Sequence, residues 1–86
     1  MDFNEHKPIY LQIVDTLYNR ILQGEWRESL RIPSVRELGA QLGVNPNTVM
    51  RAYEYLQNLE IIYNRRGIGY FLSENAARVI IKIQKE

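Results

Sequence analysis

The chain has 86 residues, the size of one small domain. Its 45% hydrophobic and 24% charged content is too apolar for a disordered tail, and no apolar run approaches the roughly 20 residues that span a membrane. The absence of cysteine excludes disulfides and thiol chemistry, and the net charge of +1 does not by itself predict a polyanionic partner.

The first predicted element is a helix over residues 8–22. Two neighbouring stripes of apolar side chains recur at helical spacing, which predicts one broad buried face. The stripes are Ile9, Ile13, Leu17 and Ile21 beside Tyr10, Val14, Tyr18 and Leu22. Pro8 suits the first helical turn, and Gly24 suits the position after the last. The polar positions, Gln12 among them, predict a solvent-exposed face.

A connector and a short second helix follow. Residues 25–33 have no helical period and end in a proline, so we expect a connector with at most a short strand at 30–32. Ser34 and Glu37 have the spacing of a capping box, in which each side chain bonds the other residue's backbone N–H. The helix that they open is expected to end at Gly43.

The third helix starts only two residues later. Asn45 is expected to cap it, with Pro46 at its first position, and apolar residues continue at helical spacing to Leu59. Two helices joined by so short a turn match the helix-turn-helix pattern, whose second helix reads the DNA major groove. The face turned away from the predicted core carries Asn47, Met50, Arg51 and Glu54. Glu54 would repel phosphate unless it lies beyond the groove.

A hairpin is predicted after this helix. Residues 61–64 and 70–73 are rich in β-branched and aromatic side chains, and the loop between them is Arg65-Arg66-Gly67-Ile68-Gly69. Two arginines beside glycines allow close approach to a phosphate or entry into a narrow minor groove. The element order predicts a mainly α (α+β) fold, a winged helix-turn-helix with a three-helix core and a C-terminal β-hairpin wing.

The last residues predict a short helix that Ser73 can cap. Its apolar side is Ala76, Val79, Ile80 and Ile83. Such a helix is too short to be stable alone, so this side must contact either its own domain or a second chain. We expect residues 1–73 to form the winged-helix domain and residues 74–86 to begin a dimerisation segment. The predicted dimer contacts are Val79, Ile80 and Ile83.

Several segments resemble the DNA-binding domain of GntR-type bacterial transcription regulators, most of all the YtrA-like branch. They are PIYLQI at 8–13, PSVREL at 33–38, LGVNPNTV at 42–49, RAY at 51–53 and IYNRRGIG at 62–69. The resemblance covers about residues 7–73 and implies a domain that binds operator DNA as a homodimer, usually to repress. Relatives normally carry a C-terminal effector or dimerisation part, so the chain is either a piece of a longer product or a member with one dimerising helix.

The resemblance also implies where DNA contacts lie. The predicted DNA-binding residues are Ser34, Arg36, Asn45, Asn47, Thr48, Met50, Arg51, Arg65, Arg66, Gly67 and Gly69. We expect phosphate contacts to supply most of the affinity, and Asn47, Met50 and Arg51 to supply base choice. Many relatives have basic residues at Pro46 and Met50, so Met50 is expected to contact a thymine methyl instead. The usual Pro-Gly-Asp turn is replaced by residues 28–30.

Other functions have little support in the residues. His6 is the only histidine, and no serine, histidine and carboxylate share a pattern suited to catalysis, so we expect neither an enzyme, a metal site nor a cofactor. The start at residues 1–5 lacks the features of a secretory signal, which favours a cytoplasmic bacterial protein. No effector ligand is expected within the chain. The alternative function is a winged helix used for protein–protein interaction, which the low net charge supports.

Overall fold

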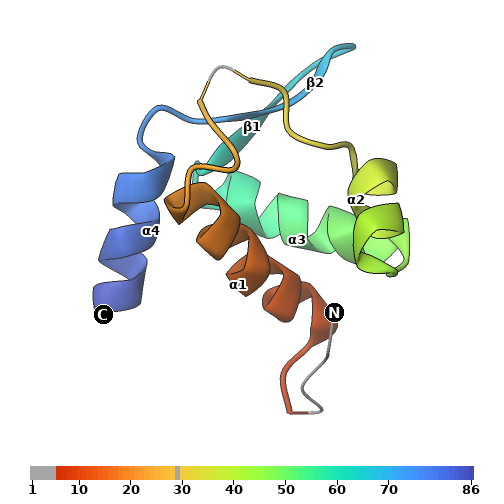
Figure 1. Ribbon diagram of the computed structural model, residues 1–86, viewed down its shortest axis with the longest axis horizontal. Helices are drawn as coiled ribbons and strands as arrows, with labels where there is room; N and C mark the ends of the chain where they lie inside the picture. The colour runs from red at the N-terminus through yellow and green to blue at the C-terminus, as the bar shows by residue number, and fades with distance from the viewer. Residues whose placement is uncertain (1–5, 29) are drawn as a thin grey trace.

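The computed structural model describes residues 6–28 and 30–86 (Figure 1). The expectations for the start at residues 1–5 and for the turn at Ser29 lie outside the described residues. The elements in chain order are α1 (Ile9–Leu22), α2 (Val35–Leu42), α3 (Pro46–Asn58), β1 (Ile62–Arg65), β2 (Gly69–Leu72) and α4 (Ala76–Lys85). Three helices followed by a hairpin confirm the predicted winged helix-turn-helix.

Helix α1 buries the middle of the predicted apolar face and also one polar side chain. At its two ends the prediction is wrong, because Ile9 is 43% exposed and Leu22 is 38% exposed. Ile13 and Leu17 are fully buried, in agreement with the stripe pattern. Gln12 was predicted to be exposed, and this is wrong, because it is only 9% exposed. Its side-chain amide donates a hydrogen bond of 2.8 Å to the carbonyl oxygen of Lys7, which satisfies the buried polar group.

The helix-turn-helix forms through the predicted caps. Both hydrogen bonds of the capping box at the start of α2 are present, and Gly43 ends the helix in the left-handed region at φ 70°. Glycine adopts this left-handed conformation without the steric cost of a Cβ. The side chain of Asn45 accepts a hydrogen bond from the backbone N–H of Asn47 at 2.8 Å, with Pro46 in the first turn of α3. These local bonds fix the direction in which α3 leaves the turn.

The hairpin is antiparallel, with Ile62 opposite Leu72 and Arg65 opposite Gly69. Its strands therefore start and end within one residue of the predicted bounds. The connector before α2 pairs with the far side of β2, where Arg31 bridges Phe71 and the N–H of Ile32 donates to the carbonyl of Tyr70 at 3.0 Å. The short strand expected at residues 30–32 is thus reduced to an isolated bridge that ties the connector to the wing.

Helix α4 packs beside α1 and completes the core (Figure 1). Ser73 does not cap it, contrary to prediction: the N-cap is Asn75, with no side-chain hydrogen bond, and Ser73 contributes only its backbone carbonyl to the N–H of Ala76. Ile80 is fully buried in the domain's own core, so in this structure it cannot make the predicted contact with a second chain. None of the helices within the described residues is long and apolar enough to cross a membrane.

Candidate nucleic-acid interface

An open depression of about 460 Å³ lies where the start of α2 meets the start of α3. Its lining is Val35, Arg36, Asn45, Pro46, Asn47 and Met50. Four of these were predicted as site residues, and the fold brings them together although they come from two helices. Arg36 and Asn47 are exposed, so a cation and an amide are both available to a ligand there. The chemistry suits an anion or a base edge.

The N-terminus of α3 adds a favourable electrostatic environment. The first N–H groups of a helix point outward and carry a partial positive charge, which favours phosphate. The Asn45 side chain uses its oxygen to cap the helix, which leaves its NH₂ group as the donor for a ligand. The backbone N–H of Thr48 already donates to the carbonyl of Asn45 at 2.9 Å, and its side chain is half-buried. Asn47 is therefore the most accessible polar side chain of the first turn.

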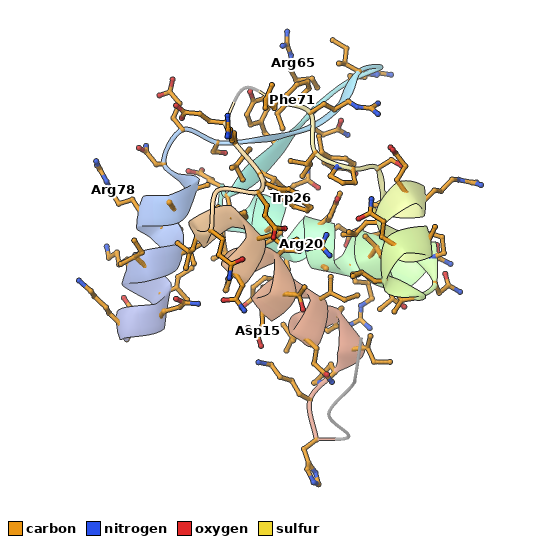
Figure 2. All side chains as sticks on the ribbon, in the orientation of Figure 1. Asp15, Arg20, Trp26, Arg65, Phe71 and Arg78 are labelled. Atoms are coloured by element: carbon orange, nitrogen blue, oxygen red, sulfur yellow. The ribbon has the colours of Figure 1, made fainter. Side chains whose placement is uncertain are left out.

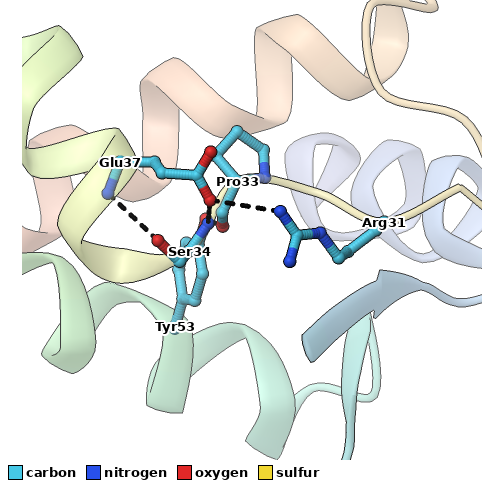
Figure 3. A network of polar contacts seen from close by, with 5 residues as sticks. All are labelled: Arg31, Pro33, Ser34, Glu37 and Tyr53. Atoms are coloured by element: carbon cyan, nitrogen blue, oxygen red, sulfur yellow. Dashed lines mark hydrogen bonds and ion pairs between the residues drawn. The ribbon is translucent and has the colours of Figure 1, made fainter. Parts of the chain in front are cut away.

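A polar network stands at the entry to α2 (Figure 3). The hydroxyl of Ser34 accepts from the N–H of Glu37, and the Glu37 carboxylate accepts from the N–H of Ser34, both at 3.1 Å. These bonds, and then the nearby Arg31 guanidinium, hold the pKa of Glu37 below its ordinary value. Because its oxygen caps the helix, Ser34 offers a ligand mainly its hydroxyl proton.

Arg31 is a residue of this region that the sequence did not single out. Its guanidinium donates to the Glu37 carboxylate at 3.4 Å, and its aliphatic stem lies against Gly69 at the base of the wing. A Cβ at position 69 would come within 3.1 Å of the Arg31 Cδ, so glycine makes this approach possible. The sequence pattern did not indicate this contact, because 38 residues separate the two positions along the chain. Arg31 thus joins α2 to the wing.

Tyrosines join α3 to the rest of the interface. Tyr53 is fully buried, and its hydroxyl donates to the carbonyl of Pro33 at 2.6 Å (Figure 3). Burial raises the pKa of Tyr53 far above its ordinary value, which keeps the hydroxyl a donor. Its ring contacts Tyr70 edge-on at 4.9 Å, and the Tyr70 hydroxyl donates to the sulfur of Met50 at 3.7 Å. Met50 is therefore held at the wing side of α3.

The two wing arginines lie in different surroundings. Arg66 and Gly67 form the exposed turn, where Gly67 has a φ of 79°. Arg65 instead lies over the ring of Phe71 at 5.5 Å on the outer face of the hairpin (Figure 2). Within the described ranges neither arginine pairs with a carboxylate. Arg66 is thus the cation of the tip, and Arg65 is held back along the strand.

Arg51 lies apart from the depression. It borders a second hollow of about 200 Å³ lined by Tyr10, Arg51, Glu54, Tyr55 and Asn58. Its guanidinium carbon is 4.2 Å from the centroid of the Tyr10 ring on α1. The structure therefore divides the predicted recognition residues between two sides of α3, with Met50 toward the wing and Arg51 toward α1. Among the described residues, no group of three acidic or histidine side chains gathers to hold a metal ion.

Comparison with known sequences identifies relatives along most of the chain. Residues 9–72 match the family described as "Bacterial regulatory proteins, gntR family". The chain is 38% identical to the HTH-type transcriptional repressor YtrA of Bacillus subtilis over 82 residues, which cover 95% of this chain and 63% of the repressor. It spans about three fifths of the length of this and two other curated relatives.

Solved structures share the fold. A GntR family transcriptional regulator from Listeria monocytogenes superposes with a TM-score of 0.87 at 41% identity, covering 96% of this chain and 75% of that one. The DNA-binding domain of AraR, determined in complex with its operator ORR3, superposes with a TM-score of 0.74 at 27% identity over 85% of this chain and 88% of that one.

Proposed function

Because the chain belongs to the GntR family of bacterial regulatory proteins, we propose that its winged helix binds an operator in double-stranded DNA and represses transcription. The observation that carries the proposal is the depression at the start of α3, where Arg36, Asn47 and Met50 line one open surface. The operator complex of the AraR domain, which shares this fold, supports it. The repressor YtrA supports the sign of the regulation.

In the proposed complex, the first turns of α3 enter the major groove and the wing enters the minor groove. Asn47 and Met50 face base edges, since both line the depression. Arg66 and Gly67 insert at the wing tip, where a glycine lets the backbone approach the duplex closely. Apart from Arg51, which is treated below, the remaining predicted residues contact phosphates: Ser34, Arg36, Asn45, Thr48, Arg65 and Gly69.

We further propose that the protein acts in the bacterial cytoplasm as a homodimer on an inverted repeat. Residues 1–73 form the DNA-binding domain and residues 74–86 the start of the dimer contact. Val79 and Ile83 are half-buried on α4 and keep part of their apolar surface for a second copy. An inverted repeat follows from a two-fold dimer because each half-site meets one recognition helix.

Selection from a randomised duplex library tests the proposal. The purified domain is incubated with the library at about 150 mM salt, where non-specific phosphate binding is already weak. We expect recovery of an inverted repeat. Recovery of a single half-site would refute the dimer but would still support sequence-specific DNA binding. Recovery of no motif would refute sequence-specific binding and favour the alternative, a protein partner for the exposed helix face.

Two variants separate affinity from base choice on the recovered site. Arg66→Ala removes a cation that contacts a phosphate or the minor groove. It should therefore weaken binding to every duplex and lower the salt dependence of the affinity. Asn47→Ala should lose about 1 to 3 kcal/mol on the selected site and little on others. Equal losses for both variants on all sequences would contradict this division. Thermal unfolding of both variants provides the control, because both side chains are exposed.

A further inference from the structure

The side chain of Arg51 is held by a contact that the proposed DNA complex does not require. Its Cζ lies 4.2 Å from the centre of the Tyr10 ring, the geometry of a cation–π contact. Tyr10 is itself packed partly against the core, and its ring meets the Tyr55 ring edge-on at a centroid distance of 6.3 Å. Arg51 therefore rests on an aromatic platform built from α1 and α3.

The platform leaves the guanidinium available for a ligand. Arg51 is exposed, and no carboxylate in the described part of the chain forms an ion pair with it, although Glu54 lines the same hollow. A guanidinium above a ring still presents its N–H donors around its edge, and their fork matches two phosphate oxygens. A pre-positioned arginine also loses less side-chain entropy when it binds.

The position of Arg51 on α3 indicates which part of DNA it meets. Successive helical residues are turned by 100°, so Met50 and Arg51 lie toward opposite edges of the exposed face. Met50 contacts Tyr70 of the wing, and Arg51 contacts Tyr10 of α1. A helix of about 10 to 12 Å diameter fills a major groove about 12 Å wide, so side chains at its edges meet the flanking strands.

We infer that Tyr10 is a positioning residue that holds Arg51 as a contact to a backbone phosphate on the α1 side of the recognition helix. This differs from the role in base choice that the sequence favoured for Arg51. The inference rests on the proposed function, because it specifies one contact of the same DNA complex. Asn47 and Met50 are left to read bases, and Arg51 fixes how deeply α3 sits in the groove.

The test measures affinity against salt concentration, from about 50 to about 200 mM, on the selected duplex and on single-base variants of it. Arg51→Ala should lower the slope of log affinity against log salt by about 0.9, the value for one phosphate contact, with base preferences unchanged. Tyr10→Leu should weaken binding by about threefold, in line with the strength of an exposed cation–π contact. Tyr10→Phe keeps the ring and should bind like the wild type.

A double-mutant comparison separates positioning from a structural role. In the Arg51→Ala background, Tyr10→Leu should cause little further loss, because the contact that it supports is already gone. The same threefold loss in both backgrounds would overturn the inference and assign Tyr10 to packing alone. A changed base preference with an unchanged salt slope in Arg51→Ala would also overturn it. Asn47→Ala is the matched control, with changed base preference and an unchanged slope.

A measurement on the free protein, without DNA, tests the contact between Tyr10 and Arg51 when a variant also loses stability. In NMR spectra of the free domain, the Arg51 Nε–H resonance should shift when Tyr10→Leu removes the ring current, and should stay in place in Tyr10→Phe. No shift in Tyr10→Leu would refute the platform. If the wild type selects no sequence, the proposed operator function fails. The slope of log affinity against log salt, measured on one duplex of fixed sequence, still tests the phosphate contact. Absence of duplex binding even at about 50 mM salt would refute both.

Discussion

Replacement of Gly39 by alanine tests what sets the geometry of the helix-turn-helix. Gly39 is buried in α2, and a Cβ there would lie 2.8 Å from the carbonyl oxygen of Val44 and 3.5 Å from the Cα of Pro46. Both contacts are to backbone atoms, so the turn itself has to move. The N–H of Val44 also donates to the Gly39 carbonyl at 2.9 Å, so the same movement strains the bond that closes α2.

Two opposing effects set the size of the change. Glycine within a helix is about 1 kcal/mol less favourable than alanine, so helix propensity alone predicts that Gly39→Ala stabilises the domain by that amount. A methyl group forced into a packed site costs about 1 to 3 kcal/mol. We therefore expect a net loss of between about zero and 2 kcal/mol in the free energy of unfolding. For a domain of this size the melting temperature falls by as much as roughly 10 °C.

Urea unfolding followed by circular dichroism measures this change, and Ala40→Gly serves as its control. Ala40 is the exposed neighbour on the same helix, so its replacement reports propensity without a clash and should lose about 1 kcal/mol. If Gly39→Ala gained as much stability as Ala40→Gly loses, both variants would report propensity alone, and the steric reasoning would be refuted.

Two further predictions concern the network at the entry to α2. Tyr53→Phe leaves the carbonyl of Pro33 without its donor, so it should lose about 1 to 2 kcal/mol in urea unfolding, and wild-type stability would contradict this role. The folded pKa of Glu37 is lowered chiefly by its bonds to Ser34, so its contribution is present above the ordinary value of 4.5 and is lost as pH falls through the folded value. Between about pH 6 and about pH 3, the urea concentration at the unfolding midpoint should therefore fall more in the wild type than in Glu37→Gln. An equal fall in both proteins would exclude a stabilising contribution of the Glu37 carboxylate.

The features that sequence predicted correctly depend on residues close together in the chain. The cap at Ser34 involves a residue three positions away, and that at Asn45 a residue two positions away. The left-handed turn at Gly43 likewise depends on its own backbone. Because such bonds form within one helical turn, the residue types and their spacing are enough to indicate them. The helix-turn-helix was predictable for this reason.

The features that sequence missed depend on contacts between distant segments. Gln12 has the polarity of a surface residue, but it is buried where α1 meets the core and its amide bonds Lys7. Arg31 reaches Gly69 across the wing, and Arg51 reaches Tyr10 across the space between two helices. The spacing of residues on α3 showed that Arg51 is exposed, but it could not show which neighbour would hold the side chain or toward which strand it would point.

The burial of Ile80 bears on the geometry of the proposed dimer. Ile80 and Ala76 anchor α4 in the core, and Val79 and Ile83 pack partly against it. The orientation of α4 is therefore set by packing within one domain, against the core and α1. If a second copy docks on α4, the separation of the two recognition helices follows from that contact. We therefore expect one fixed half-site spacing among selected operators. A spread of spacings would mean that α4 leaves the core when the dimer forms, which would free Ile80 for the contact that the sequence first suggested.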